Sequence, residues 1–110
     1  MDIIIQSLGF KASDSLENHI NQKLEKIASH TDTAIRANVT LFKGPASEPE
    51  NSMCEIRLEV PGNDHFVKKH ADTFERAVSE AAIALEHVVQ KIKDKAIASR
   101  HANDNGALAG

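Results

Sequence analysis

The sequence predicts an α+β fold with the element order βαβββα, a four-stranded sheet with two helices packed on one face. Two patterns lead to this prediction. From Asp72 to Lys95 apolar residues recur every three or four positions, which is the spacing of a helix with one buried stripe. Shorter segments upstream alternate apolar and polar residues, as strands with one buried face do. The 110 residues suffice for one domain, which we place at residues 1–96.

The first two predicted elements are a strand and a helix. Asp2–Leu8 is short and rich in isoleucine, which favours a strand. Ala12–His30 is predicted to be a helix of about four turns. Its apolar residues at helical spacing are Leu16, Ile20, Leu24 and Ile27. Because Asp14 and Glu17 have the spacing of a capping box, we expect Asp14 to cap this helix.

Three further strands are predicted at Thr33–Lys43, around Cys54–Val60 and, more weakly, at His65–Ala71. The residues expected to face the core are Ile35, Ala37, Val39 and Leu41 in the first of these strands and Cys54, Ile56, Leu58 and Val60 in the second. A mobile loop at Gly44–Ser52 and a turn at Pro61–Asp64 connect them as an antiparallel meander. The N-terminal strand, linked through a helix, is expected to lie parallel to the second strand.

The last predicted element is the long helix, which we expect Asp72 to cap with Glu75 in the capping-box position. The stripe expected to face the sheet consists of Phe74, Val78, Ala81, Leu85, Val88 and Ile92. The periodicity ends after Lys95, and Asn, Gly and Ala prevail beyond it. Residues 97–110 are therefore predicted to form a flexible C-terminal tail.

The composition excludes several classes of function. The net charge of −3 gives no global attraction to nucleic acid or to anionic lipid, so such a contact needs a local patch. Without Trp or Tyr, and with four Phe, the chain has few surfaces on which unpaired bases stack. The N-terminus has no apolar run long enough for a signal peptide or a membrane span, so we expect a cytoplasmic protein without a membrane partner.

Signals of catalysis are scarce, and we expect no enzyme, no metal site, no cofactor and no small-molecule substrate. The chain has no glycine-rich phosphate loop and no serine nucleophile elbow, and its six histidines are scattered. Cys54 occupies the apolar register of a strand, which indicates a buried thiol and not a nucleophile. Glu55 and Glu59 flank Arg57 on the outer face of that strand, which favours an exposed charge ladder over an acid–base pair.

The lysines on the two helices are the strongest functional indication from single residues. They are Lys23 and Lys26 on the first helix and Lys91, Lys93 and Lys95 near the end of the second. Cations near a helix C-terminus also stabilise the helix dipole and then need no partner, so this explanation stays open for them. Lys68 and Lys69 on the fourth strand are interpreted as guards of a sheet edge against aggregation.

The order of the predicted elements and the residues of both helices resemble the short ribosome hibernation-promoting factor and ribosome-associated inhibitor family, also called protein Y. The resemblance covers about residues 1–95. The first helix is similar to the family pattern L-x-x-x-I-x-x-K-L-x-K-L at Leu16, Ile20, Lys23, Leu24, Lys26 and Ile27. The second is similar to the pattern A-I-D-x-A-x-x-x-L-E-R-Q-L-x-K-Y-K at Ala77, Val78, Leu85, Glu86, Lys91 and Lys93.

The resemblance implies a translation regulator without catalytic activity. Such a protein occupies the small ribosomal subunit where messenger and transfer RNA would pass, and it idles ribosomes during stress, slow growth or stationary phase. It implies contacts to ribosomal RNA phosphates, which position a protein without reading sequence. The residues it implies for these contacts are Lys23, Lys26, His87, Lys91 and Lys93.

Two departures from the family pattern reduce the expected affinity. His87, Val88 and Val89 stand where the pattern has Arg-Gln-Leu, and Ile92 replaces its aromatic residue. In residues 73–96, four acids balance four basic residues. Weak or salt-sensitive ribosome binding is expected from this charge balance. The chain is also too short for the dimerising C-terminal domain of longer family members, so it is not expected to pair ribosomes alone.

Two alternatives remain open from the sequence. The first is an acidic relative that has lost ribosome binding and acts through protein contacts, for instance as a weak homodimer that uses the open sheet face or an exposed Ile83. The second is general binding of double-stranded RNA by a related αβ sandwich. It is disfavoured because such modules need a basic helix start, whereas the second helix begins with Asp72 and Glu75.

Overall fold

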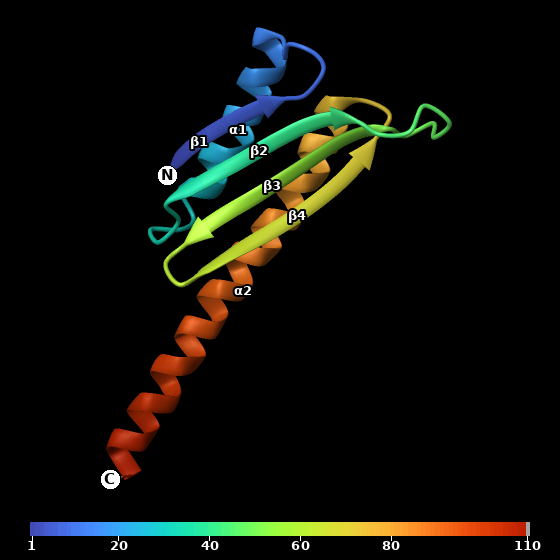
Figure 1. The fold of residues 1–110 in the computed structure, drawn as a ribbon. Helices are drawn as coiled ribbons and strands as arrows, with labels where there is room; N and C mark the ends of the chain where they lie inside the picture. The colour runs from blue at the N-terminus through green and yellow to red at the C-terminus, as the bar shows by residue number, and fades with distance from the viewer. Residues whose placement is uncertain (110) are drawn as a thin grey trace.

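The computed structural model describes the backbone of residues 1–109 and the side chains of residues 1–96. Over that range the predicted order βαβββα is confirmed (Figure 1). The elements are β1 Asp2–Ser7, α1 Asp14–Ala28, β2 Arg36–Lys43, β3 Ser52–Val60, β4 Asn63–Ala71 and α2 Phe74–Ala109. The described part of the chain contains no helix that is both long enough and apolar enough to cross a membrane.

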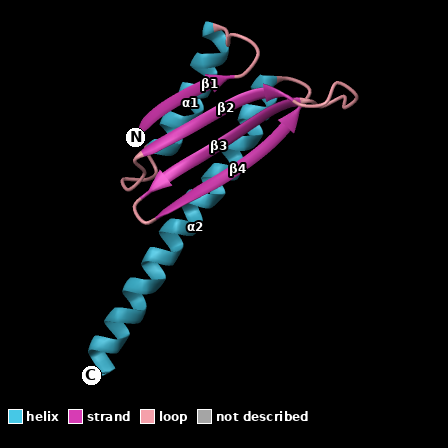
Figure 2. Cartoon of the chain, in the orientation of Figure 1, coloured by secondary structure: helices cyan, strands magenta, loops and turns pink. Residues whose placement is uncertain are grey.

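The four strands form one mixed sheet in the order β1-β2-β3-β4. β1 pairs in parallel with β2, as the sequence predicts, and the meander of β2, β3 and β4 is antiparallel. Both helices lie on the same face of this sheet (Figure 2). The molecule therefore has two layers, one of helices and one of strands, and the outer face of the strands is left uncovered.

The core lies between the sheet and the helices. Strand residues at alternate positions are buried there, among them Ala37, Val39, Leu41, Cys54, Ile56 and Leu58. The four predicted core residues of α1, which are Leu16, Ile20, Leu24 and Ile27, are all buried as well. Burial of such side chains stabilises the fold by about 1.5–3 kcal/mol for each large residue. The packing of helices on strands thus holds both layers in place.

The stripe of α2 is confirmed at its centre and shifts at its end. Val78, Ala81 and Leu85 are buried, whereas Val88 is half-buried and its neighbour Val89 is buried in its place. Phe74 and Ile92 are half-buried too. The predicted spacing repeats every seven residues, and on a straight helix such a repeat drifts by about 20°. One turn beyond Leu85 the drift has moved Val88 away from the sheet and brought Val89 towards it.

Both predicted helix caps are wrong by one residue. Ser13, and not Asp14, caps α1: its Oγ accepts a hydrogen bond from the backbone N–H of Leu16 at 3.1 Å. Thr73, and not Asp72, caps α2 through its Oγ1 at 3.2 Å from the backbone nitrogen three residues on. Serine, threonine and aspartate all cap helices well, so the sequence pattern does not distinguish adjacent candidates.

Two predicted boundaries also change. β2 begins at Arg36 and not at Thr33, and Ile35 is 53% exposed because it precedes the first position covered by the helices. α2 does not end near Lys95 but continues to Ala109, so it projects beyond the sheet (Figure 1). Residues 97–109 are thus helical where an irregular tail is predicted, and the flexibility of this segment stays a prediction.

Truncation of a buried α2 residue tests the two-layer core. Leu85 is fully buried, so Leu85→Ala is expected to lower the free energy of unfolding by about 2–5 kcal/mol in a urea titration. Ile83 is 59% exposed on the same helix and serves as the control. Ile83→Ala is expected to change stability by less than about 0.5 kcal/mol. Equal losses in the two variants would contradict the observed orientation of α2.

Candidate functional site on the helical layer

The two helices lie side by side and run in the same direction. β1 and β4 point the same way because β1 is parallel to β2 and two antiparallel pairings follow. Each helix returns along the sheet from one of these outer strands, so the last turn of α1 lies beside the middle of α2 (Figure 1). Ala77, Ala81 and Ala82 of α2 are buried, and their small side chains allow close packing beneath the surface between the helices.

A histidine of α1 fixes the two helices against each other. The Nε2 atom of His19 lies 3.1 Å from the carbonyl oxygen of Glu75 and 3.0 Å from the Oγ of Ser79. Because a carbonyl oxygen only accepts, Nε2 carries the hydrogen in this arrangement. The contact joins residues 56 positions apart in the sequence and links α1 directly to the first turns of α2.

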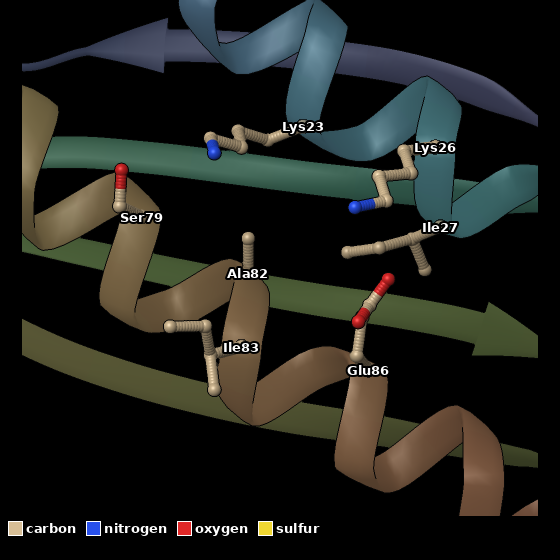
Figure 3. Close-up of a pocket in the computed structure, with 7 residues that line it drawn as sticks. All are labelled: Lys23, Lys26, Ile27, Ser79, Ala82, Ile83 and Glu86. Carbon is tan, nitrogen blue, oxygen red and sulfur yellow. The ribbon is translucent and has the colours of Figure 1, made fainter.

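A groove of about 110 Å³ lies between α1 and α2 (Figure 3). The residues that line it are Lys23, Lys26 and Ile27 of α1 and Ser79, Ala82, Ile83 and Glu86 of α2. The amines of Lys23 and Lys26 both extend towards α2 over this groove (Figure 3). The three-residue spacing of these lysines places them on one side of α1, so the structure brings the two predicted cations together.

Glu86 supplies the opposite charge to the same groove. Its carboxylate extends from α2 towards the side on which Lys26 lies (Figure 3). Its Oε1 lies 3.5 Å from Nδ1 of His30, and within the described residues this oxygen has no hydrogen-bond partner. A carboxylate beside two amines lowers the positive potential that they create. The groove therefore carries localised cations without being strongly basic as a whole.

Of the other three predicted site residues, His87 lies nearest to the groove. It lines one hollow of about 370 Å³ with Lys69 and Glu80, and another of about 280 Å³ that shares two lining residues with the groove. Lys91 lines another hollow, of about 180 Å³, with His65 of β4. Lys93 lines none of the hollows described here and is exposed. The five predicted residues thus share the helical layer without forming one continuous patch.

Helix geometry separates Lys91 from Lys93. Residues two positions apart on an α-helix differ in direction by about 200°. Lys93 follows Glu86 by seven residues, so it lies on the α1 side of α2, in line with the groove. Lys91 points to the side of β4. Because their side chains point to opposite sides of α2, Lys91 and Lys93 cannot contact the same phosphate group of a ligand that lies on the groove.

Lys68 and Lys69 both lie on β4, an edge strand of the sheet, which agrees with their interpretation as edge guards. As neighbouring residues of a strand, they point to opposite faces. Lys68 lies on the outer face, where its Nζ is 3.6 Å from Oε1 of Glu55. Lys69 lies on the helical side and lines the hollow of His87. The period of two in β4 is the signal that assigns Lys69 to the helical layer.

The glutamates on the outer face of the sheet pair with neighbouring polar side chains. Glu55 has Lys68 as its cross-strand partner, and Oε2 of Glu59 accepts a hydrogen bond from Nδ2 of Asn38 at 2.7 Å. These contacts confirm the predicted charge ladder. In the part of the chain with described side chains, no three His, Cys, Asp or Glu residues gather closely enough to hold a metal ion.

Cys54 is confirmed as a buried, free thiol in the core. Burial away from water and, to a smaller extent, the negative charge of Glu55 raise the pKa of Cys54 from 9.0 to about 12. The thiol stays protonated at neutral pH, so it lacks the thiolate that nucleophilic chemistry needs.

Comparisons with known proteins agree with this fold. The family model described as "Sigma 54 modulation protein / S30EA ribosomal protein" matches residues 3–97. A solved ribosomal subunit interface protein from Coxiella burnetii superposes with a TM-score of 0.76 at 18% identity, covering 86% of this chain and 99% of that one. The N-terminal domain of Protein Y from Thermus thermophilus superposes with a TM-score of 0.71 at 22% identity, covering 84% and 99%. No curated protein sequence matches the chain.

The burial of Cys54 makes its reactivity a reporter of unfolding. In native buffer at neutral pH, we expect the thiol to react with a disulfide reagent only at the rate at which the core opens. In concentrated urea the reaction is expected to be complete at once. Because the thiolate is disfavoured in the folded state, stability is retained below pH 9 and declines as the pH rises towards 12. Fast labelling of the native protein at pH 7 would contradict the observed burial.

Proposed function

The chain belongs to the Sigma 54 modulation protein / S30EA ribosomal protein family, and on this premise we propose that it is a translation regulator that binds the small ribosomal subunit. We further propose that it inactivates idle ribosomes under stress or slow growth, in the cytoplasm and without catalysis. The observation that carries the proposal is the groove in which Lys23 and Lys26 of α1 extend together towards α2 (Figure 3).

The groove suits contact with an RNA backbone. An ammonium group binds phosphate as a point charge and does not need a fixed approach angle. The two amines project from a helix that is held in place by its buried stripe and by the His19 contact. The backbone that carries them is therefore already positioned before RNA binds. Phosphate contacts position a protein without reading bases, which fits a rigid protein seated on a structured RNA surface. The related Coxiella burnetii protein is named a ribosomal subunit interface protein.

The charge balance sets the expected strength of this binding. Glu86 lies in the groove and Glu80 lies in the hollow of His87, so carboxylates accompany the cations on both sides of α2. Binding that relies on about four phosphate contacts loses affinity with a slope of about −3 in log K against log salt. We therefore propose a reversible complex that forms readily at low salt and weakens steeply at moderate salt.

Removal of the two groove lysines tests the proposal. In co-sedimentation with purified small subunits at low salt, Lys23→Ala/Lys26→Ala is expected to weaken binding by at least about tenfold, since two phosphate contacts are lost. The matched control is Arg57→Ala/Lys68→Ala, which removes two cations from the outer face of the sheet. That control is expected to bind as the unmodified chain does. Absence of co-sedimentation of the unmodified chain at low salt would refute the proposed function.

Single alanine variants of the two α2 lysines test the orientation of the RNA. Lys93 lies in line with the groove, so Lys93→Ala is expected to weaken binding and to make the salt slope less steep by about one phosphate contact. Lys91 faces the β4 side, and Lys91→Ala is expected to have a smaller effect. Titrations at several salt concentrations give both slopes. A larger effect of Lys91→Ala would show that the RNA lies over β4 and not over the groove between the helices.

A further inference from the structure

The outer face of the sheet is uncovered in this chain and contains apolar residues in an ordered pattern. We call it the open sheet face. Reading across the strands from β1 to β4, its rows are Asp2, Arg36, Glu59, Asp64; then Ile4, Asn38, Arg57, Phe66; then Gln6, Thr40, Glu55, Lys68; and, from β2 to β4, Phe42, Met53, His70. The second row begins and ends with an exposed apolar side chain, since Ile4 is 48% and Phe66 is 58% exposed. The two apolar side chains therefore mark the two edges of the face, with polar residues between them.

The open sheet face is poorly suited to RNA. It carries four carboxylates, which are Asp2, Glu55, Glu59 and Asp64, against the three cations Arg36, Arg57 and Lys68. Each cation lies within 4.0 Å of one of these carboxylates, so no cation is left over for a phosphate. A surface close to neutral, with apolar residues at both edges, suits another protein surface of the same composition.

Each row of the open sheet face can pair with the same row read in the opposite direction. We propose that the open sheet face binds a second copy of this chain. A twofold axis that runs along the strands, midway between β2 and β3, places β1 over β4 and β2 over β3 of the second copy. Each row then faces the same row read backwards. Two sheets that face each other in this way form the aligned packing of a β-sandwich, about 10 Å apart.

Most of the resulting pairs are favourable. Ile4 meets Phe66 of the second copy, and the half-buried Phe42 meets Met53 of the second copy. Because of the twofold symmetry, each of these apolar contacts occurs twice in the dimer. Arg36 meets Glu59 of the second copy, so opposite charges face each other across the interface. Polar residues oppose polar residues elsewhere, as Thr40 does with Glu55 of the second copy.

One pair is unfavourable, which places a limit on the affinity. Asp2 meets Asp64 of the second copy, but both lie at the ends of the outermost row, where water screens their repulsion. The face of four strands measures on the order of 500 Å² for each copy, given strands about 4.8 Å apart. About 1,000 Å² in total is at the lower limit for a specific interface, so we infer a weak, reversible dimer.

The exposed Ile83 offers a less suitable surface for self-association. Ile83 is 59% exposed, but it lines the same groove as Lys23 and Lys26. A second copy seated there would bring four lysines into one interface, and like charges at close range oppose association. The open sheet face lies on the opposite layer (Figure 2), so a dimer formed through it leaves the groove between the helices accessible.

Sedimentation velocity of the full chain from about 10 µM to about 1 mM tests the proposal, because a weak dimer becomes populated as the protein concentration rises through that range. The unmodified chain is expected to shift from monomer to dimer, and Phe66→Glu is expected to stay monomeric. Ile83→Glu is the matched control, since the two residues are equally exposed on opposite layers. It is expected to dimerise normally. A monomeric chain at about 1 mM, or loss of the dimer in Ile83→Glu with retention in Phe66→Glu, would overturn the proposal.

A mixing experiment tests the pairing of Ile4 with Phe66 itself. Ile4→Lys and Phe66→Glu are each expected to be monomeric alone, because a charge faces an apolar side chain at both contacts of the dimer. In a mixture, one contact pairs the introduced lysine with the introduced glutamate, and the other pairs the natural isoleucine with the natural phenylalanine. The mixture is therefore expected to recover the dimer at concentrations where neither variant forms one. Recovery excludes misfolding as the cause of the loss, and a mixture that stays monomeric would contradict the proposed symmetry.

Discussion

The structure depends on the burial of two helical stripes against the inner face of one sheet. Leu85 of α2 and Ile20 of α1 are fully buried opposite strand residues such as Ile56, so each helix can lie on the sheet in one orientation only. This burial determines which residues remain at the outer surface of the helices. Lys23 and Lys26 reach the groove because the buried residues Leu24 and Ile27 hold α1 on the sheet in this orientation. The site is therefore a consequence of the core.

The two-layer arrangement also separates two kinds of surface. The helical layer carries cations with accompanying carboxylates around a groove, and the strand layer carries a nearly neutral ladder with apolar residues at its edges. The chain belongs to the S30EA family, and we propose that the first surface binds the ribosome and that the second binds another copy of the chain. Because the layers face away from each other, occupation of one leaves the other exposed, and the two proposals can be tested independently.

Much of the fold follows from the sequence because apolar periodicity reports burial directly. The order of elements, the parallel pairing of β1 and the core register of Val39, Cys54 and Leu85 could all be predicted in this way. The caps could not, since Ser13 and Asp14 are equally good candidates until the backbone is placed. The site was harder still. The separation of Lys91 from Lys93 follows from helix geometry, but the contact of His19 with Ser79 depends on how two distant helices pack. Residue type alone carries no signal for such a contact.

The claim that the helical layer is the ribosome-binding surface is tested most directly by lysine footprinting. The chain is labelled with a lysine acylating reagent, with and without purified small ribosomal subunits at low salt, and the modification of each lysine is measured by mass spectrometry. We expect the subunit to protect Lys23 and Lys26, which lie in the groove, and to leave Lys68 reactive on the opposite layer. Protection of Lys68 with continued labelling of Lys23 and Lys26 would contradict the claim.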